Sequence, residues 1–135
     1  MKKQRSKFTK VLIANRGEIA LRAVKIAKKL GVQSIVIYST ADKSSQHVLQ
    51  ADDAICIGPA PSSKSYLAKN AIIHTALSLS CEAIYPGYGF LSENAEFVEL
   101  CEANNIKFIG PTAESIRQMG DKSTARKIAV TNNVP

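Results

Sequence analysis

Tryptophan is absent from this 135-residue chain, and aromatic residues make up only 6% of it. A nucleic-acid-binding domain more often carries its basic charge on a folded face, interleaved with aromatic side chains. Here the formal net charge of +7 gathers at the N-terminus, where residues 1–10 hold five basic groups and no acidic one. The other 125 residues hold 13 basic and 11 acidic groups, so the basicity belongs mostly to a tail. We therefore expect no nucleic-acid partner.

Long apolar segments and paired cysteines are missing as well. No run of residues reaches the length of about 20 apolar residues that a membrane-spanning helix needs, so we expect no membrane association. The three cysteines are widely spaced, and no Cys-x-x-Cys pair indicates a zinc site or a disulfide framework. Cys56 and Cys101 lie among apolar residues and are predicted to be small core residues. This cysteine usage is typical of a reducing compartment.

Several motifs of nucleotide-binding and hydrolytic enzymes are also absent. The chain has no Gly-x-x-x-x-Gly-Lys-Ser/Thr phosphate loop, no Gly-x-Ser-x-Gly elbow and no His-Glu-x-x-His pair. The turn from Asn15 to Glu18 holds one glycine, where a dinucleotide-binding fold has Gly-x-Gly-x-x-Gly. NAD binding in the usual way is therefore disfavoured, although the N-terminus of the following helix could still hold an anion.

The apolar periodicity predicts five strands that alternate with helices. Continuous apolar runs, typical of strands in a parallel sheet covered on both faces, occur at residues 10–15, 34–39, 53–57, 82–85 and 106–109. Helical periodicity occurs at residues 17–30, 66–80, 92–104, 113–119 and 122–130, with a shorter pattern around 47–49. The alternation predicts an α/β fold with an open, mostly parallel, doubly wound sheet of Rossmann-like type.

Local signals place some helix ends and faces. Ser92 is expected to cap the helix after the fourth strand, with Glu93 in its first turn. Gly120 is expected to interrupt the helical pattern, so that Asp121 caps a last helix. His74 is expected to be partly buried on the apolar stripe of its helix. That stripe is predicted to consist of Leu67, Ala71, His74 and Leu77.

The stretch from Tyr85 to Asn94 joins the fourth strand to its helix and reads Tyr-Pro-Gly-Tyr-Gly-Phe-Leu-Ser-Glu-Asn. Gly87 and Gly89 let the backbone adopt positive φ and let another molecule come close to it. A rigid, glycine-rich turn at this place is where an open α/β sheet binds ligands. The alternative interpretation is an ordinary strand-to-helix turn.

Two other places carry candidate ligand-binding residues. Arg16 and Glu18 flank a glycine after the first strand, at the same sheet edge as the turn after the fourth strand. We expect the two turns to form a shared rim, which consists of residues 14–18 and 85–90. Lys122 is predicted in the first turn of a helix, where it is well placed to meet a phosphate; the alternative is a solvated surface lysine.

Five motifs occur in one order along the chain and carry a family resemblance. They are Ile13-Ala14-Asn15-Arg16-Gly17-Glu18-Ile19-Ala20, Cys56-Ile57-Gly58-Pro59, the stretch from Tyr85 to Asn94, Phe108-Ile109-Gly110-Pro111 and Met119-Gly120-Asp121-Lys122. From about Phe8 onward the chain closely resembles the N-terminal domain of biotin carboxylase. That family includes the biotin carboxylase subunit of acetyl-CoA carboxylase, which serves fatty acid biosynthesis, and regions of pyruvate, propionyl-CoA and methylcrotonyl-CoA carboxylases. Tyr85 departs from the pattern, since many members have histidine there.

The resemblance implies roles for residues at matching positions. Lys122 resembles the family's ATP-contacting lysine from this domain. Tyr88 and Gly89 resemble part of the biotin-side wall, and Glu93 is a further substrate-side candidate. The helix over 17–30 resembles the family's dimer-facing helix, on which the interface candidates are Arg22 and Lys25.

The resemblance also implies an ATP-dependent ligase of ATP-grasp architecture. In that family ATP and bicarbonate give carboxyphosphate, and the carboxyl group passes to N1 of biotin on a carrier protein. The implied cofactors are ATP, Mg²⁺ or Mn²⁺, and biotin. The implied partners are a biotin carboxyl carrier protein or domain, a carboxyltransferase component and a second copy in a homodimer. The implied compartment is the cytoplasm or, alternatively, the mitochondrial matrix.

The expected domain organisation is a basic tail over residues 1–9 and a pre-ATP-grasp domain over residues 10–135. The ATP-grasp and C-terminal domains, with the catalytic and metal-binding residues, are expected beyond Pro135, so this segment alone is expected to fold without catalysing. Two alternatives stay open. One is the pre-grasp domain of another ATP-grasp ligase, such as a carbamoyl-phosphate synthase, and the other is a non-enzymatic interaction module.

Overall fold

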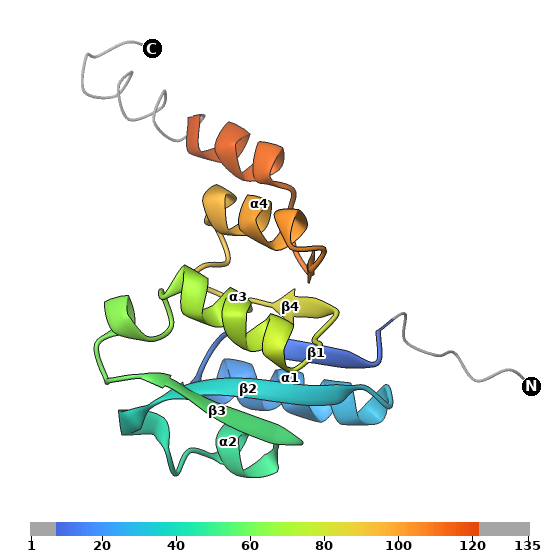
Figure 1. Cartoon of the computed structure of the whole chain (residues 1–135), viewed down its shortest axis with the longest axis vertical. Coiled ribbons are helices and arrows are strands. Elements are labelled where there is room, and N and C mark those ends of the chain that lie inside the picture. Colours follow the sequence, from blue (N-terminus) through green and yellow to red (C-terminus); the bar gives the residue numbers. More distant parts are fainter. Residues whose placement is uncertain (1–7, 122–135) are drawn as a thin grey trace, which may run out of the picture.

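The computed structural model describes residues 8–121, and within them strands and helices alternate as the sequence predicts (Figure 1). The strands are β1 (Lys10–Ile13), β2 (Gln33–Ser39), β3 (Asp53–Gly58), β4 (Ala83–Tyr85) and β5 (Lys107–Phe108). The helices are α1 (Gly17–Lys29), α2 (Gln46–Gln50), α3 (Lys69–Ser78) and α4 (Ala95–Ala103), with short 3-10 turns at Thr40–Asp42 and Ser62–Lys64. Residues 113–121 are helical too.

The strands form one parallel sheet in the order β3-β2-β1-β4-β5. The chain moves outward from β1 to β2 and β3, and then returns across the sheet to place β4 on the other side of β1. The strand order therefore reverses between β1 and β4, and ligands of open α/β sheets bind at such a point, outside the carboxyl ends of the strands. The predicted α/β, doubly wound fold is confirmed.

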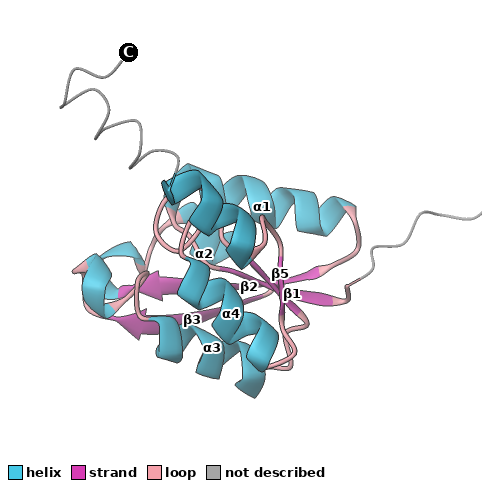
Figure 2. Cartoon of the chain, turned by 90° about the horizontal axis from the view of Figure 1, so that it is seen from above, coloured by secondary structure: helices cyan, strands magenta, loops and turns pink. Residues whose placement is uncertain are grey.

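Helices cover both faces of the sheet, with α1 and α2 on one side and α3 and α4 on the other (Figure 2). Successive side chains of a strand point to opposite faces, and β1 serves both layers in this way. Leu12 joins the large core cluster under α3 and α4. Ile13 joins the smaller cluster under α1, with Ala20 and Val24. A strand that buries both faces needs the unbroken apolar run that the sequence shows.

Two predictions of helix ends are wrong. Asn94, not Ser92, caps α4, because its Oδ1 accepts a hydrogen bond from the Phe97 backbone N–H at 2.9 Å. Ser92 and Glu93 lie in the turns before the helix. Gly120 does not interrupt the last described helix, which runs through Asp121. A single glycine costs a helix interior only about 1 kcal/mol, so the helix continues through it.

Two predictions of burial are also wrong. His74 is exposed, because α3 buries Ile72, Ile73 and Ala76 in place of the predicted stripe. Apolar residues lie all round this helix, so the sequence pattern did not determine which side faces the sheet. Cys56 is exposed, since β3 is an edge strand and none of its residues is fully buried. Cys101 is buried, as predicted.

Candidate functional site

The shared rim forms where the sequence predicts it, at the carboxyl ends of the neighbouring strands β1 and β4. The Ala14 backbone N–H donates to the Tyr85 carbonyl oxygen at 2.8 Å and extends the pairing by one residue. Asn15, next along the chain, is only 1% exposed. Its side-chain Nδ2 donates to the carbonyl oxygens of Pro86 at 2.8 Å and Tyr88 at 2.7 Å. The two halves of the rim are therefore joined directly.

The turn after β4 packs tightly on its inner side and is open on its outer side. Gly87 has φ +67°, and an added Cβ would lie 2.6 Å from Ile19 Cγ2 and 2.8 Å from Asn15 Nδ2. Gly89 has φ +70°, and apart from Gly89 itself and its two chain neighbours no described atom lies within 4 Å of the position of an added Cβ. Tyr88, between them, is 77% exposed. A ligand can therefore approach the backbone at Gly89.

Arg16, on the β1 side of the rim, is held by a carboxylate from the next strand connection. Its Nε donates to Asp42 Oδ2 at 2.6 Å and its terminal nitrogen to Asp42 Oδ1 at 2.5 Å. This fork matches the planar geometry of a carboxylate. The hydrogen bonds from Arg16 lower the pKa of Asp42 from 3.8 to about 2, against the opposing effect of burial. The half-exposed guanidinium is thereby held at the N-terminal end of α1.

Tyr66 connects this ion pair to the turn after β4. Its phenol donates to Asp42 Oδ2 at 2.5 Å and accepts from the Ser39 backbone N–H at 3.0 Å. Burial raises the pKa of Tyr66, so the phenol keeps the proton that it donates. The Tyr66 ring also packs against Phe90, with ring centroids 5.1 Å apart. Residues from four strand connections thus form one bonded and packed cluster beside the rim.

The residues singled out from the sequence lie in different places. Tyr88 and Gly89 lie together on the rim. Glu93, exposed after the turn, lines a second hollow together with Met119 and Gly120 from the helix over 113–121. Lys122, the predicted ATP contact, directly follows that helix in sequence and lies outside the described residues.

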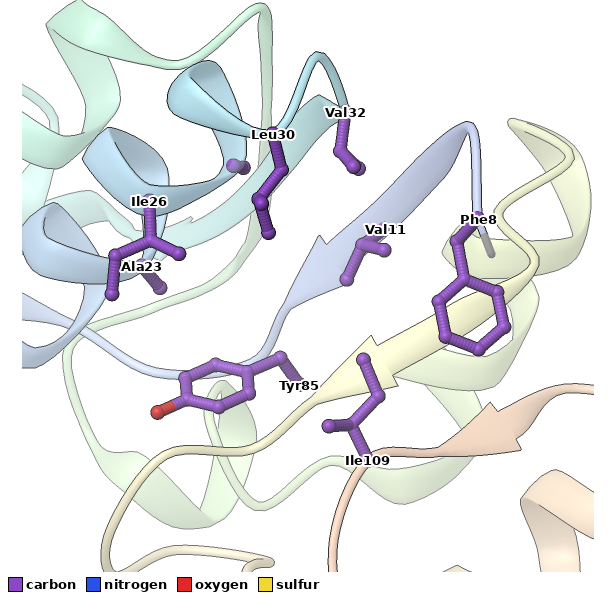
Figure 3. A pocket seen from close by; sticks show the side chains of 9 residues that line it. Phe8, Val11, Ala23, Ile26, Leu30, Val32, Tyr85 and Ile109 are labelled. Carbon is purple, nitrogen blue, oxygen red and sulfur yellow. The ribbon is translucent and has the colours of Figure 1, made fainter. Parts of the chain in front are cut away.

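Arg22 and Lys25, the interface candidates, lie exposed on α1. The same helix leaves two large apolar side chains exposed, Ile26 at 57% and Leu30 at 55%. They line a groove of about 290 Å³ between α1 and the sheet, with Phe8, Val11, Ala23, Ala27, Val32, Tyr85 and Ile109 (Figure 3). The groove is almost entirely apolar and separate from Tyr88 and Gly89.

Sequence reasoning did not single out the residues that hold the rim together, which are Asn15, Asp42, Tyr66 and Phe90. One signal was present for Asp42. It follows the buried strand β2 on the same sheet edge as Arg16, where polar side chains of parallel sheets meet. Tyr66 carried no such signal, because it precedes a helix and its partners come from other connections.

Within residues 8–121, no group of three or more His, Cys, Asp or Glu side chains lies close enough together to hold a metal ion. The described helices also include none that is long and apolar enough to cross a membrane.

Comparison with known proteins identifies relatives of this arrangement. The family model described as biotin carboxylase, N-terminal domain, matches residues 7–116. The mitochondrial methylcrotonoyl-CoA carboxylase subunit alpha of Mus musculus is 59% identical over 128 residues, which are 95% of this chain and 18% of that protein. The biotin carboxylase of a Nostoc species is 54% identical over 129 residues, which are 96% of this chain and 29% of that protein. The chain thus spans less than a third of the length of these relatives.

Solved structures agree with the sequence comparison. A biotin carboxylase–beta-gamma-ATP complex from Campylobacter jejuni superposes with a TM-score of 0.84 at 51% identity, over 96% of this chain and 29% of that one. The K. lactis urea amidolyase superposes with a TM-score of 0.87 at 46% identity, over 98% of this chain and 8% of that one. Biotin carboxylases are thus found by the comparison of sequences and by the comparison of structures.

Proposed function

Because the chain belongs to the biotin carboxylase N-terminal domain family, we propose that it is the first domain of a longer ATP-dependent ligase that carboxylates biotin. The whole protein would use ATP and bicarbonate to carboxylate biotin on a carrier protein. The family match over residues 7–116 carries this proposal. It favours a biotin carboxylase over the pre-grasp domain of a carbamoyl-phosphate synthase, and over a module without enzymatic context.

Within that protein, the shared rim would contribute the biotin side of the site. Tyr88 and Gly89 would meet the biotin ring system, which is supported by the 77% exposure of Tyr88 and the open backbone at Gly89. Glu93 would lie on the substrate side of the neighbouring hollow. Lys122, outside the described residues, would contact ATP, since the helix over 113–121 that precedes it lines the same hollow as Glu93.

The described residues fit biotin better than they fit a metal ion. The rim has an open backbone position and an exposed aromatic side chain, which suit a small uncharged ring with hydrogen-bonding atoms. As the family resemblance implies, Mg²⁺ or Mn²⁺ would be held by residues of the later domains together with the phosphates of ATP. The role of this segment would be to bind and orient, and the catalytic groups would lie in the ATP-grasp and C-terminal domains that follow residue 135.

The exposed residues of α1 would form a contact surface for the rest of the assembly. The exposed apolar side chains of Ile26 and Leu30 support this, since such side chains are usually covered in a complex. Arg22 and Lys25 would lie at a homodimer interface there. The other partners would be a biotin carboxyl carrier protein or domain and a carboxyltransferase component, as part of an acetyl-CoA, other acyl-CoA or pyruvate carboxylase. The compartment would be the cytoplasm or the mitochondrial matrix.

The proposal is tested by ADP release from the full-length protein with ATP, bicarbonate and free biotin. We expect ADP release that requires both bicarbonate and biotin, and none from residues 1–135 alone. A full-length protein that hydrolyses ATP equally well without biotin would contradict the proposal. Biotin-dependent turnover by residues 1–135 alone would contradict the assignment of the catalytic groups to later domains.

A further inference from the structure

Asn15 is a buried amide whose hydrogen-bonding groups all serve the two halves of the rim. Its Nδ2 donates to Pro86 O and Tyr88 O. Its Oδ1 accepts from the Arg16 backbone N–H at 2.8 Å. A side-chain amide has two N–H donors, and here each of the two carbonyl oxygens lies within hydrogen-bonding distance of them. With 1% exposure, Asn15 has no surface left to offer a ligand.

The bond from Asn15 to Tyr88 O has a direct geometric consequence. Tyr88 C=O and Gly89 N–H belong to one peptide unit, and no described peptide bond is cis. In a trans peptide the C=O and N–H point in opposite directions. When Asn15 holds the oxygen on the inner side, the Gly89 N–H is turned to the outer side. No hydrogen bond among residues 8–121 takes up that N–H, so it is available as a donor.

The opposite end of the turn is held independently. Phe90, which has φ +48°, packs on the ring of Tyr66. Ser92 N–H donates to Gly89 O at 2.9 Å, so the next peptide unit is also fixed. On its inner side the Tyr88–Gly89 peptide is thus hydrogen-bonded by a single side chain, Asn15, and the residues after it have contacts of their own.

We propose that Asn15 is a positioning residue for biotin, which turns the Gly89 N–H outward as a preorganised donor to a polar atom of the ring system. This role of Asn15 rests on the proposed function, since it requires biotin to bind at the rim. Asn15 acts through Tyr88 and Gly89 and does not itself touch the substrate. A donor that is already oriented loses no conformational freedom on binding, so the benefit appears in affinity for biotin and not in affinity for ATP.

The test compares Asn15→Asp, Asn15→Ala and the unaltered full-length protein in steady-state kinetics with free biotin. Asn15→Asp keeps the shape and the acceptor for Arg16 N–H, but it removes both donors and sets a carboxylate oxygen against two carbonyls. We expect KM for biotin to rise about tenfold, as a free-energy loss of about 1.4 kcal/mol produces, with KM for ATP unchanged. The matched control is Asn104→Asp, which removes a side-chain donor to Leu100 O at the end of α4 and is expected to leave both KM values unchanged.

A second measurement separates the inference from the proposed function. Amide hydrogen exchange of the Ser92 N–H, which donates to Gly89 O, is expected to accelerate in Asn15→Ala, with exchange in β1 and β2 unchanged. Unchanged KM for biotin in both folded Asn15 variants would overturn the inference while the activity of the unaltered protein stands. If both variants fail to fold and Asn104→Asp folds, Asn15 is a purely structural residue and the inference is equally overturned. Absence of biotin-dependent activity in the unaltered protein would instead refute the proposed function.

Discussion

Tyr66 and Asp42 lie 24 positions apart in the sequence, and the phenol of one donates to the carboxylate of the other at 2.5 Å. The same carboxylate accepts both hydrogen bonds from Arg16. Asp42 is 4% exposed, so its charge is stabilised by these partners and not by water. Through these hydrogen bonds, the conformation of the connection after β2, which holds Asp42, depends on the connections that hold Arg16 and Tyr66.

Removing the Tyr66 hydroxyl tests this dependence. Tyr66→Phe keeps the ring that packs on Phe90, but it leaves the buried Ser39 N–H without its acceptor and Asp42 without one donor. We expect a loss of about 1–3 kcal/mol in the free energy of unfolding, measured by urea denaturation of the 135-residue chain. Tyr88→Phe is the matched control, because the Tyr88 side chain is 77% exposed. Equal stability of the two variants would contradict the prediction.

The Arg16–Asp42 pair predicts a specific dependence of stability on pH. The pKa of Asp42 in the folded chain, about 2, lies below the ordinary 3.8, so Asp42 binds a proton more readily in the unfolded chain. The stabilisation is therefore complete above pH 3.8 and is lost as the pH falls towards 2. We expect the free energy of unfolding of the wild-type chain to be about 2 kcal/mol higher than that of Asp42→Asn at neutral pH. This difference is expected to shrink as the pH falls. Urea denaturation of both proteins across this range measures it, and a difference that stays constant with pH would refute it.

Gly87 and Gly89 have similar φ but different surroundings, so alanine should affect them unequally. In Gly87→Ala the new methyl group would press on Ile19 and Asn15, in addition to the strain of a positive φ. Gly89→Ala meets the strain alone, since its surroundings are open. We expect a loss of about 1 kcal/mol for Gly89→Ala and about 1 kcal/mol or more beyond that for Gly87→Ala. The measurement is urea denaturation, and the reverse order would show that the turn does not pack on Asn15.

The start of α4 offers a comparison of two neighbouring polar residues. Asn94→Ala removes the acceptor for the Phe97 N–H and should lower the free energy of unfolding by about 1 kcal/mol. Ser92→Ala removes a side chain outside the helix and should change stability by less than about 0.5 kcal/mol. Thermal and urea denaturation of both variants decide between the caps. A larger effect at Ser92 would restore the assignment expected from the sequence.

The sheet could be predicted from the sequence because its strands are short unbroken apolar runs. The meeting of the two glycine-containing turns could be predicted too, because the carboxyl ends of parallel strands lie at the same edge of a sheet. The residues that join those turns could not be predicted. Asn15 and its acceptor on Pro86 lie 71 positions apart, and local periodicity carries no information on such a pair. α3 shows the opposite difficulty, since it has more apolar side chains than one face can bury, and His74 was assigned to the wrong side. The ATP contact at Lys122 stays a prediction.

The central position of β1 has a consequence for the order of assembly. Its first partner, β2, follows after a single helix, so these two strands can pair soon after they leave the ribosome. Its second partner, β4, lies 72 positions further along the chain than β1, as the pairing of Val11 with Ala83 shows, and closing so long a loop is slow in comparison with local pairing. The shared rim is consequently a late product of folding. A nascent chain halted before Tyr85 can hold the β1–β2–β3 part of the sheet and still lack one half of the rim.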